Sequence, residues 1–183
     1  MFVLGAGVSL IAPQFLSVEN FSQVATLAAV IAVAAVGEAF VIITRGIDLS
    51  VEAMIGLVAY CVARTLELQV LDPIGAIAMG LAIGLLLGMV NGFIVTILKV
   101  PAIVATLGTL SIFRGIDYVI AGPDQVPLAG LPEGFTDWAR ADVLGIPVFV
   151  LVTIVVVALG MVLLRSTRVG RQGARDAQAL LLA

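Results

Sequence analysis

Long runs without a charged residue set the strongest limit on what this chain can fold into. Residues 73–98 form a run of 26 uncharged residues, and residues 143–164 form a second run of 22. An α-helix needs about 20 apolar residues to cross the hydrocarbon core of a bilayer. Each run is therefore long enough to span a membrane, and we expect an all-α fold, a polytopic membrane helix bundle.

The composition supports a membrane protein over a soluble one. Hydrophobic residues make up 62% of the chain and charged residues 11%, whereas a typical soluble protein has about 25% charged residues. A soluble globule of this size could not cover its surface with so few polar side chains. The lipid bilayer is therefore the expected surrounding of the chain.

The same composition excludes several functional classes. The net charge is −3, which leaves no basic face for nucleic acid. The chain has no histidine, and Cys61 is its only cysteine, so the sequence predicts neither a catalytic pair that needs histidine nor a metal site. No GxxxxGK[ST] phosphate-binding loop is present. The chain is therefore expected to have no ATPase site of its own and to bind no cofactor.

The apolar segments predict about six transmembrane helices with both ends in the cytoplasm. The first helix falls in residues 1–12, and its true start is open. The others are expected at residues 24–44, 51–66, 73–98, 100–121 and 143–164. Cytoplasmic loops carry an excess of Lys and Arg, which places on the inside Arg45, Lys99, Arg165, Arg168, Arg171 and Arg175. The acidic segment 122–142 is then outside, where a short surface helix is expected.

Glu38 is the most conspicuous polar residue of the second predicted helix. An ionisable side chain inside a membrane is costly and usually faces the interior of the bundle. We expect Glu38 to reach a polar group on another helix, with Asn91, Thr106 or Thr109 as first candidates. These four residues are candidates for a substrate pathway, and interhelical hydrogen bonding is the alternative role for each of them.

Two further pairs of polar residues lie in or beside the predicted helices. Arg114 and Asp117 are three residues apart on one helix and so share a face, which predicts a local ion pair or a gate. Asp48 and Ser50 precede the helix expected at 51–66. Both residue types cap helix N-termini well, so a capping role is expected.

Four glycines repeat every fourth residue along the helix expected at 73–98. Such a ridge of small residues lets another helix backbone approach closely. Helix packing is the main expectation, and a substrate groove along the ridge is the alternative. The ridge comprises Gly80, Gly84, Gly88 and Gly92.

Three stretches of the sequence resemble a known family. Residues 40–51 read FVIITRGIDLSV and resemble the FVIITGGIDLSVG stretch of bacterial ABC transporter permeases of the ribose/simple-sugar type. Residues 91–115, NGFIVTILKVPAIVATLGTLSIFRG, resemble that family's NG…KVPAFIATLGT…RG stretch. Residues 145–148, GIPV, and 167–171, TRVGR, resemble its GIPVPV…TRFGR stretch. The three stretches occur in the family's order and at its separations.

The resemblance implies a role in transport. It implies the membrane subunit of an ATP-driven importer for a monosaccharide or related small polar solute, in the bacterial inner membrane. The implied partners are a separate ATP-binding subunit that carries the ATP, an extracytoplasmic solute-binding protein and a second permease copy. Family-like residues at the cytoplasmic end of the last predicted helix are the candidates for docking the ATP-binding subunit: Thr167, Arg168, Gly170 and Arg171.

The chain also departs from the family pattern. Arg45 and Glu52 stand where the family commonly has glycine. Residues 1–172 are expected to form a partial permease membrane domain, equivalent to the N-terminal half of a full permease. Residues 173–183 form a short tail that resembles nothing in the family.

Two other functions stay open at this point. An ion-coupled secondary carrier or channel would use Glu38 as its proton group. A truncated permease fragment would insert into the membrane without transporting anything.

Overall fold

A computed structural model describes residue 7 and residues 11–122, 126–143 and 145–166. The described residues fall into two compact units, one comprising Glu38–Asp137 and the other the described parts of Met1–Gly37 and Trp138–Ala183. The main helices are α2 (Val18–Ile43), α3 (Val51–Glu67), α4 (Pro73–Thr96), α5 (Ala102–Ala121), α6 (Glu133–Arg140) and α7 (Val148–Ser166). Short elements add the 3₁₀ turns η1 (Pro13–Leu16) and η2 (Leu128–Gly130) and the strands β1 (Asp142–Val143) and β2 (Ile146–Pro147).

The expected all-α membrane bundle is confirmed, with one two-stranded ribbon as its only β-structure in the described residues. The helices α2, α4 and α5 are long and apolar enough to cross a membrane, and α7 contains a shorter apolar stretch, Val148–Leu164. The first predicted helix lies almost wholly outside the described residues. The count of six crossings and the cytoplasmic placement of both ends stay predictions.

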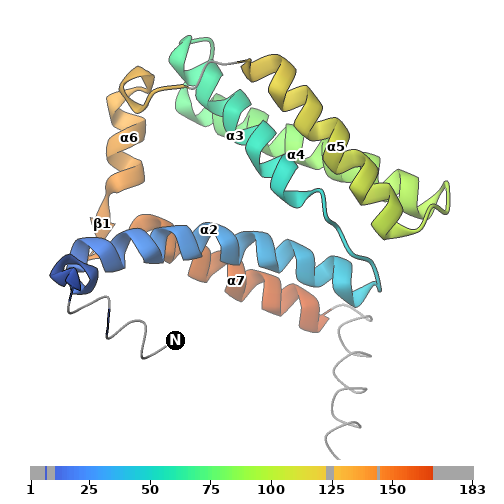
Figure 1. Ribbon diagram of the computed structural model, residues 1–183, viewed down its shortest axis with the longest axis horizontal. Helices are drawn as coiled ribbons and strands as arrows, with labels where there is room; N and C mark the ends of the chain where they lie inside the picture. The colour runs from blue at the N-terminus through green and yellow to red at the C-terminus, as the bar shows by residue number, and fades with distance from the viewer. Residues whose placement is uncertain (1–6, 8–10, 123–125, 144, 167–183) are drawn as a thin grey trace, which may run out of the picture. The chain divides into compact units, whose positions relative to one another are not determined.

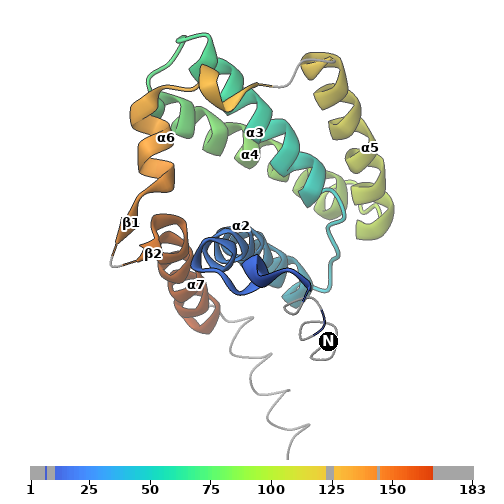
Figure 2. The same ribbon diagram turned by 60° about the vertical axis from the view of Figure 1, so that its left-hand side comes forward.

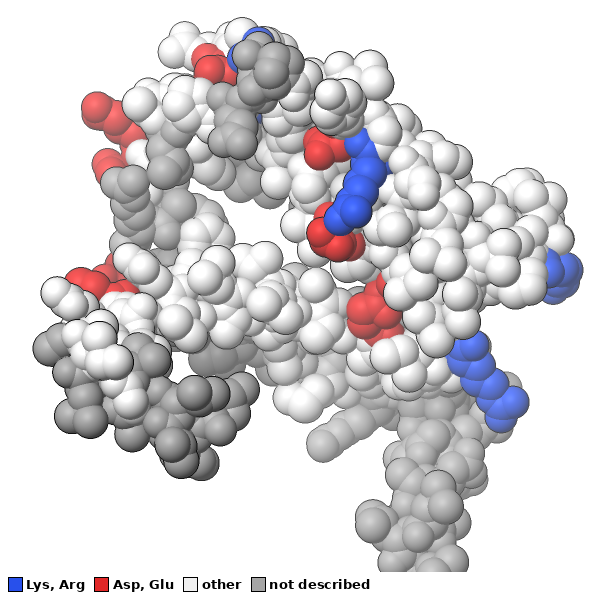
Figure 3. Space-filling view, viewed as in Figure 1, with Lys and Arg blue, Asp and Glu red and all other residues white. Residues whose placement is uncertain are grey.

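The first unit is built around α3, α4 and α5, which lie together in both ribbon views (Figures 1 and 2). Its small apolar core joins Ala53 and Leu57 of α3 to Phe113 of α5. Large apolar side chains such as Leu81, Leu85 and Met89 of α4 are instead exposed, and the visible surface carries few charges (Figure 3). Apolar surfaces with so few charges are suited to lipid.

The helix α3 begins about halfway along α5 rather than level with its start. The Thr106 hydroxyl donates a hydrogen bond to the Ile47 carbonyl oxygen (3.2 Å), and the Arg114 guanidinium donates one to Glu52 (2.8 Å). At 1.5 Å per residue, Thr106 and Arg114 lie about 6 and 18 Å from the start of α5. The two helices therefore run parallel, and the 17 residues of α3 start beside the middle of α5.

The turn after α2 directs the chain into this position. The amide of Arg45 donates to the Ile42 carbonyl and the amide of Gly46 to the Val41 carbonyl, both at 2.9 Å. This is the bonding pattern of a Schellman motif, which requires a left-handed residue just past the helix. Arg45 occupies that position with φ 62°. Glycine is favoured there, which gives a physical reason for the glycine that the resembled family has at this position.

The second unit pairs the first part of α2 with α7, which lie side by side in both views (Figures 1 and 2). The Thr153 hydroxyl donates to the Ala29 carbonyl oxygen (3.2 Å). Gly160 allows a close approach, because a Cβ there would lie 2.5 Å from a methyl group of Val36. The contact is therefore built from a small residue and one buried hydroxyl, as expected between membrane helices.

The predicted short helix in segment 122–142 is confirmed as α6. The ribbon β1–β2 follows it, with Val143 paired to Ile146 across Gly145, whose φ is 79°. The Trp138 and Phe149 rings meet edge to face at 5.7 Å. This ring contact joins the end of α6 to the start of α7.

Candidate functional site

A buried polar network joins the start of α3 to α4. The Asp48 carboxylate accepts hydrogen bonds from the Ser50 amide (2.8 Å) and the Ser50 hydroxyl (2.6 Å). The Asn91 side-chain amide donates to the Ser50 hydroxyl oxygen (2.7 Å) and to Asp48 Oδ2 (3.2 Å). Residues 43 positions apart in the chain are thus held together by charge-assisted bonds, which are stronger than neutral ones.

The network changes the role expected of Asp48 and Ser50. Ser50 is the N-cap residue of α3, but its side chain makes no capping bond to the helix. Its hydroxyl joins Asp48 to Asn91 instead, and Ser50 is fully buried. The Asp48 carboxylate turns back onto the Ser50 amide, the geometry of an Asx turn. The capping prediction is therefore wrong: the side chains of Asp48 and Ser50 connect the start of α3 to α4 and do not cap the N-terminus of α3.

The two candidate threonines of α5 are buried, and their hydroxyls form hydrogen bonds to backbone carbonyl oxygens. The Thr106 hydroxyl lies within bonding distance of the Ile47 and Ala102 carbonyl oxygens, at 3.2 and 2.8 Å. The Thr109 hydroxyl donates to the Thr106 carbonyl oxygen (3.3 Å). Thr106 therefore attaches the non-helical segment before α3 to α5. Non-helical backbone at membrane depth is tolerated where it is buried in protein or lines a cavity.

A groove of about 510 Å³ opens beside this network. It lies between the end of α2, the end of α4 and the start of α5, and polar, small and apolar residues line it. The network residues Asp48 and Asn91 line it together with Thr106. Other lining residues include Thr44, Arg45, Gly88, Gly92 and Thr96. The groove can therefore offer both donors and acceptors to a polar ligand.

Glu38 lies near this network but is not bonded to it as expected. The Asp48 carboxylate is a charged neighbour of Glu38, and the Asp48 backbone amide lies near the Glu38 carboxylate. Within the described part of the chain, Glu38 Oε1 is buried without a hydrogen-bond partner, and so is Oδ1 of Asn91. The donors of Asn91, Thr106 and Thr109 are used elsewhere, so the expected bond from one of them to Glu38 is not formed. Two buried acceptors are thus left without donors.

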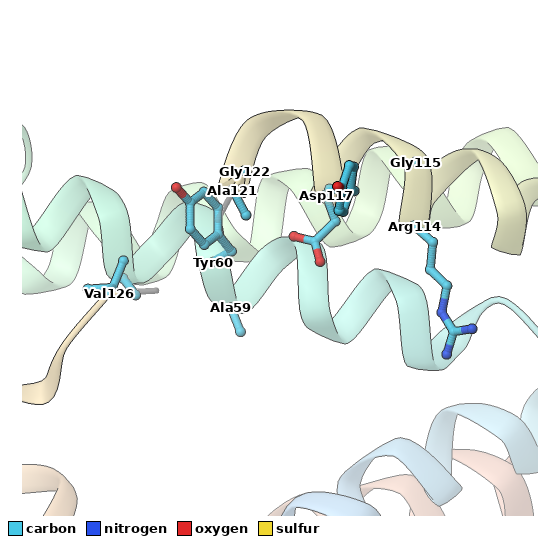
Figure 4. Close-up of a pocket in the computed structure, with 10 residues that line it drawn as sticks. Ala59, Tyr60, Arg114, Gly115, Asp117, Ala121, Gly122 and Val126 are labelled. Carbon is cyan, nitrogen blue, oxygen red and sulfur yellow. The ribbon is translucent and has the colours of Figure 1, made fainter. Parts of the chain in front are cut away.

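The expected ion pair between Arg114 and Asp117 is not formed either. Arg114 pairs with Glu52 of α3 at 2.8 Å. Asp117 Oδ1 is buried with no hydrogen-bond partner among the residues that the structure describes. Figure 4 shows the Asp117 carboxylate turned toward α3 and the Arg114 guanidinium apart from it. The parallel packing of α3 on α5 supplies Arg114 with a partner on another helix, so the partner within α5 is not used.

The glycine ridge of α4 packs closely at one position only. A Cβ on Gly80 would lie 2.7 Å from a methyl group of Val62 on α3. Among the described residues, a Cβ on Gly84, Gly88 or Gly92 would meet nothing within 4 Å, so close packing there is confined to Gly80. Gly88 and Gly92 line the groove, and a substrate role for the ridge stays a prediction.

Sequence reasoning assigned no site role to Glu52, although its departure from the family pattern was visible. Its partner Arg114 lies 62 residues away, and only the offset of α3 along α5 brings them together. The predicted docking residues 167–171 lie outside the described residues. Within the described part of the chain, no group of three or more His, Cys, Asp or Glu side chains could hold a metal ion.

Residues 20–173 match the protein family described as the permease component of branched-chain amino acid transport systems. The autoinducer 2 import system permease protein LsrC of Escherichia coli (strain K12 / DH10B) is 37% identical over 158 residues, which cover 86% of this chain and 45% of LsrC. LsrC of Shigella flexneri matches with the same values. LsrC of Salmonella paratyphi B is 36% identical over the same lengths. No solved structure matches the chain.

The chain spans about half the length of the curated relatives it matches. The match runs from the first turn of α2 to beyond α7 and includes the whole Asp48–Ser50–Asn91 network. The predicted resemblance to bacterial ABC transporter permeases is confirmed. With its apolar membrane-length helices, the protein is a multi-pass protein of the bacterial inner membrane. The chain belongs to the family of permease components of branched-chain amino acid transport systems.

Proposed function

We propose that this chain is the membrane-spanning permease subunit of an ATP-driven importer for a monosaccharide or related small polar solute. The observation that carries the proposal is the Asp48–Ser50–Asn91 network beside the groove of about 510 Å³. Ligand sites combine apolar walls with a few placed polar groups. An amide, a carboxylate and hydroxyls suit a solute that both donates and accepts hydrogen bonds.

The interrupted backbone before α3 supports transport by alternating access. Substrate sites of membrane transporters commonly lie where helices are broken near the bilayer midplane. Here the non-helical segment 46–50 precedes a helix that begins about halfway along its neighbour. The break supplies a place where helices could rock about a bound solute.

The partners follow from the relatives and from the missing phosphate loop. ATP is hydrolysed on a separate ATP-binding subunit, and an extracytoplasmic solute-binding protein delivers the solute. A second permease copy completes the pathway. The named relatives are permeases of an autoinducer 2 import system, so a small sugar-like solute is the first class to test. Membership of this family favours an ATP-driven importer over an ion-coupled carrier.

A chimera tests the proposal directly. In Escherichia coli LsrC, the segment aligned with this chain is replaced by the matching residues of this chain, in a strain without its own LsrC. We expect the chimera to take up autoinducer 2 or ribose faster than the deletion strain does. This uptake should depend on ATP and should persist in the presence of a proton uncoupler. The Asn91→Leu chimera should lose this uptake, whereas the Ser111→Ala chimera, altered at an exposed hydroxyl of α5, should keep it.

Two results would contradict the proposal. The first is a chimera that inserts at the normal level but takes up neither solute. The second is uptake that collapses with the proton gradient while ATP is unchanged, which would favour the ion-coupled carrier.

A further inference from the structure

A second polar region lies on the other side of α3, away from the network. Glu52 and Arg114 form an ion pair there, and their side chains are 79% and 59% exposed. Arg114 is the thirteenth of the 20 residues of α5, a helix long enough to cross the membrane. The pair therefore lies near mid-depth with most of its surface free of described protein atoms.

Lipid is an unsuitable neighbour for this pair. A single charged side chain at the centre of a membrane helix is strongly disfavoured and usually faces a water-filled cavity or the bundle interior. Pairing removes only part of that cost, because the outer faces of both charged groups are uncovered. Water beside the pair would hydrate these faces.

A groove of about 810 Å³ begins at Arg114 and runs between α3 and α5. Small residues keep it open, including Ala59, Ala63 and Gly115, and Figure 4 shows Tyr60 and Asp117 along it. The Tyr60 hydroxyl already donates to the Ile120 carbonyl oxygen (3.4 Å). Asp117 Oδ1 is buried, and no described residue donates a hydrogen bond to it. A buried carboxylate oxygen without a donor is costly, and water or a solute hydroxyl in the groove would remove that cost.

We propose that the groove between α3 and α5 is a water-filled part of the solute path that admits hydrogen-bond-donating solutes without negative charge, and that Glu52 sets this selectivity by pairing with Arg114. The inference rests on the proposed transport function. Without Glu52, Arg114 would present an unpaired positive charge at the groove and attract anions. With Glu52 in place, the charge of Arg114 is balanced, and Asp117 adds an acceptor for a solute hydroxyl or ammonium group.

Thiol labelling of the 183-residue chain in membrane vesicles tests whether water fills the groove. Tyr118 and Val119 are neighbours on α5 with similar exposed fractions, 77% and 81%, but only Tyr118 lines the groove. In a Cys61→Ala background, Tyr118→Cys and Val119→Cys are each treated with a membrane-impermeant methanethiosulfonate. We expect the cysteine at 118 to react at least tenfold faster than the cysteine at 119. Ala121→Cys, also in the groove, gives a second groove position if Tyr118→Cys does not insert.

The selectivity is tested with reagents of different charge at the same cysteine. Cationic, neutral hydroxyethyl and anionic methanethiosulfonates are compared in the Tyr118→Cys chain. Glu52→Gln should raise the ratio of anionic to cationic reaction rates about threefold, because it leaves one positive charge unpaired about one helical turn away. Arg114→Gln should lower the same ratio. The neutral reagent should react at an unchanged rate in both variants.

Two outcomes would overturn the inference. Equal slow labelling at 118, 119 and 121 would show that lipid or another protein segment covers the groove. A charge ratio that does not respond to Glu52→Gln or Arg114→Gln would remove the selectivity role. Because labelling needs no partner subunit and no transport, either result could occur while the chimera still transports, so failure of this inference and failure of the proposed function are distinguishable.

Discussion

Two sides of α3 hold polar side chains in different ways. Toward α4, the Asp48 carboxylate is bonded to the Ser50 amide and hydroxyl and to the Asn91 amide, and Asn91 is only 5% exposed. Toward α5, Glu52 meets Arg114 through one pair of atoms, and most of both side chains is uncovered. The first side is closed and rich in hydrogen bonds, whereas the second is open and held by a single contact.

The difference indicates separate tasks for the two sides. A buried network whose donors are nearly all used fixes one arrangement of helices, since losing any member leaves others without partners. An exposed ion pair contributes little to stability and can exchange its contacts with water or solute. The α4 side therefore holds the start of α3 in position beside the groove that Asp48 and Asn91 line, and the α5 side is free to exchange its contacts with water.

Substitution of Asn91 on the α4 side should have the largest effect on the stability of the chain. Asn91→Leu keeps the branching at Cγ in a larger, apolar side chain, takes a donor from Asp48 and leaves the Ser50 hydroxyl oxygen without its donor. We expect the free energy of unfolding in detergent to fall by about 2–3 kcal/mol. The matched control is Ser111→Ala on the exposed face of α5, which should change it by less than about 0.5 kcal/mol. Equal effects of the two substitutions would show that the network does not hold the helices together.

A substitution in the packing contact between α3 and α4 should have the next largest effect on stability. Gly80→Ala places a methyl group 2.7 Å from a methyl group of Val62, and β-branched valine has few rotamers with which to move away. The free energy of unfolding should fall by about 1–2 kcal/mol. Gly84→Ala, where the added methyl group meets nothing within 4 Å, should be neutral or slightly stabilising. If Gly84→Ala destabilised the chain as much as Gly80→Ala, the glycine ridge would pack along its length after all.

One substitution in the turn between α2 and α3 should increase the stability of the chain. Arg45 has φ 62°, a left-handed conformation that costs a residue with a Cβ about 1 kcal/mol. Arg45→Gly should therefore raise the free energy of unfolding by about 1 kcal/mol. Arg45→Ala removes the charge but keeps the Cβ, so it should give no gain. A gain from alanine as large as that from glycine would assign the effect to charge rather than to backbone conformation.

The sequence predicted the elements of this fold better than their partners. Uncharged runs located α4 (Pro73–Thr96), and Lys99 marked the break between it and the next predicted helix, because helix length and charge are local properties. Asn91 and Ser50 were each recognised as polar candidates, but their contact depends on where two helices cross. Glu52 and Arg114 could not be paired from the sequence, since the local rule of three- and four-residue spacing pointed to Asp117. The offset of α3 along α5 depends on how the two helices pack, so it cannot be predicted from the sequence of either helix alone.

We expect the smallest effect on stability from a substitution on the open side of α3, where Glu52 pairs with Arg114. If water fills the groove, Glu52→Gln leaves Arg114 hydrated, and the stability of the chain in membranes should fall by less than about 1 kcal/mol. If the pair faced lipid, the same substitution would leave a bare guanidinium near mid-depth, at a cost of about 2.5–3.5 kcal/mol. A double-mutant cycle with Arg114→Gln isolates the coupling between the two side chains from the effect of each substitution alone. Coupling below about 1 kcal/mol agrees with an exposed, hydrated pair. Coupling above about 2 kcal/mol would mean that the pair is shielded from water, and the contrast between the two sides of α3 would then disappear.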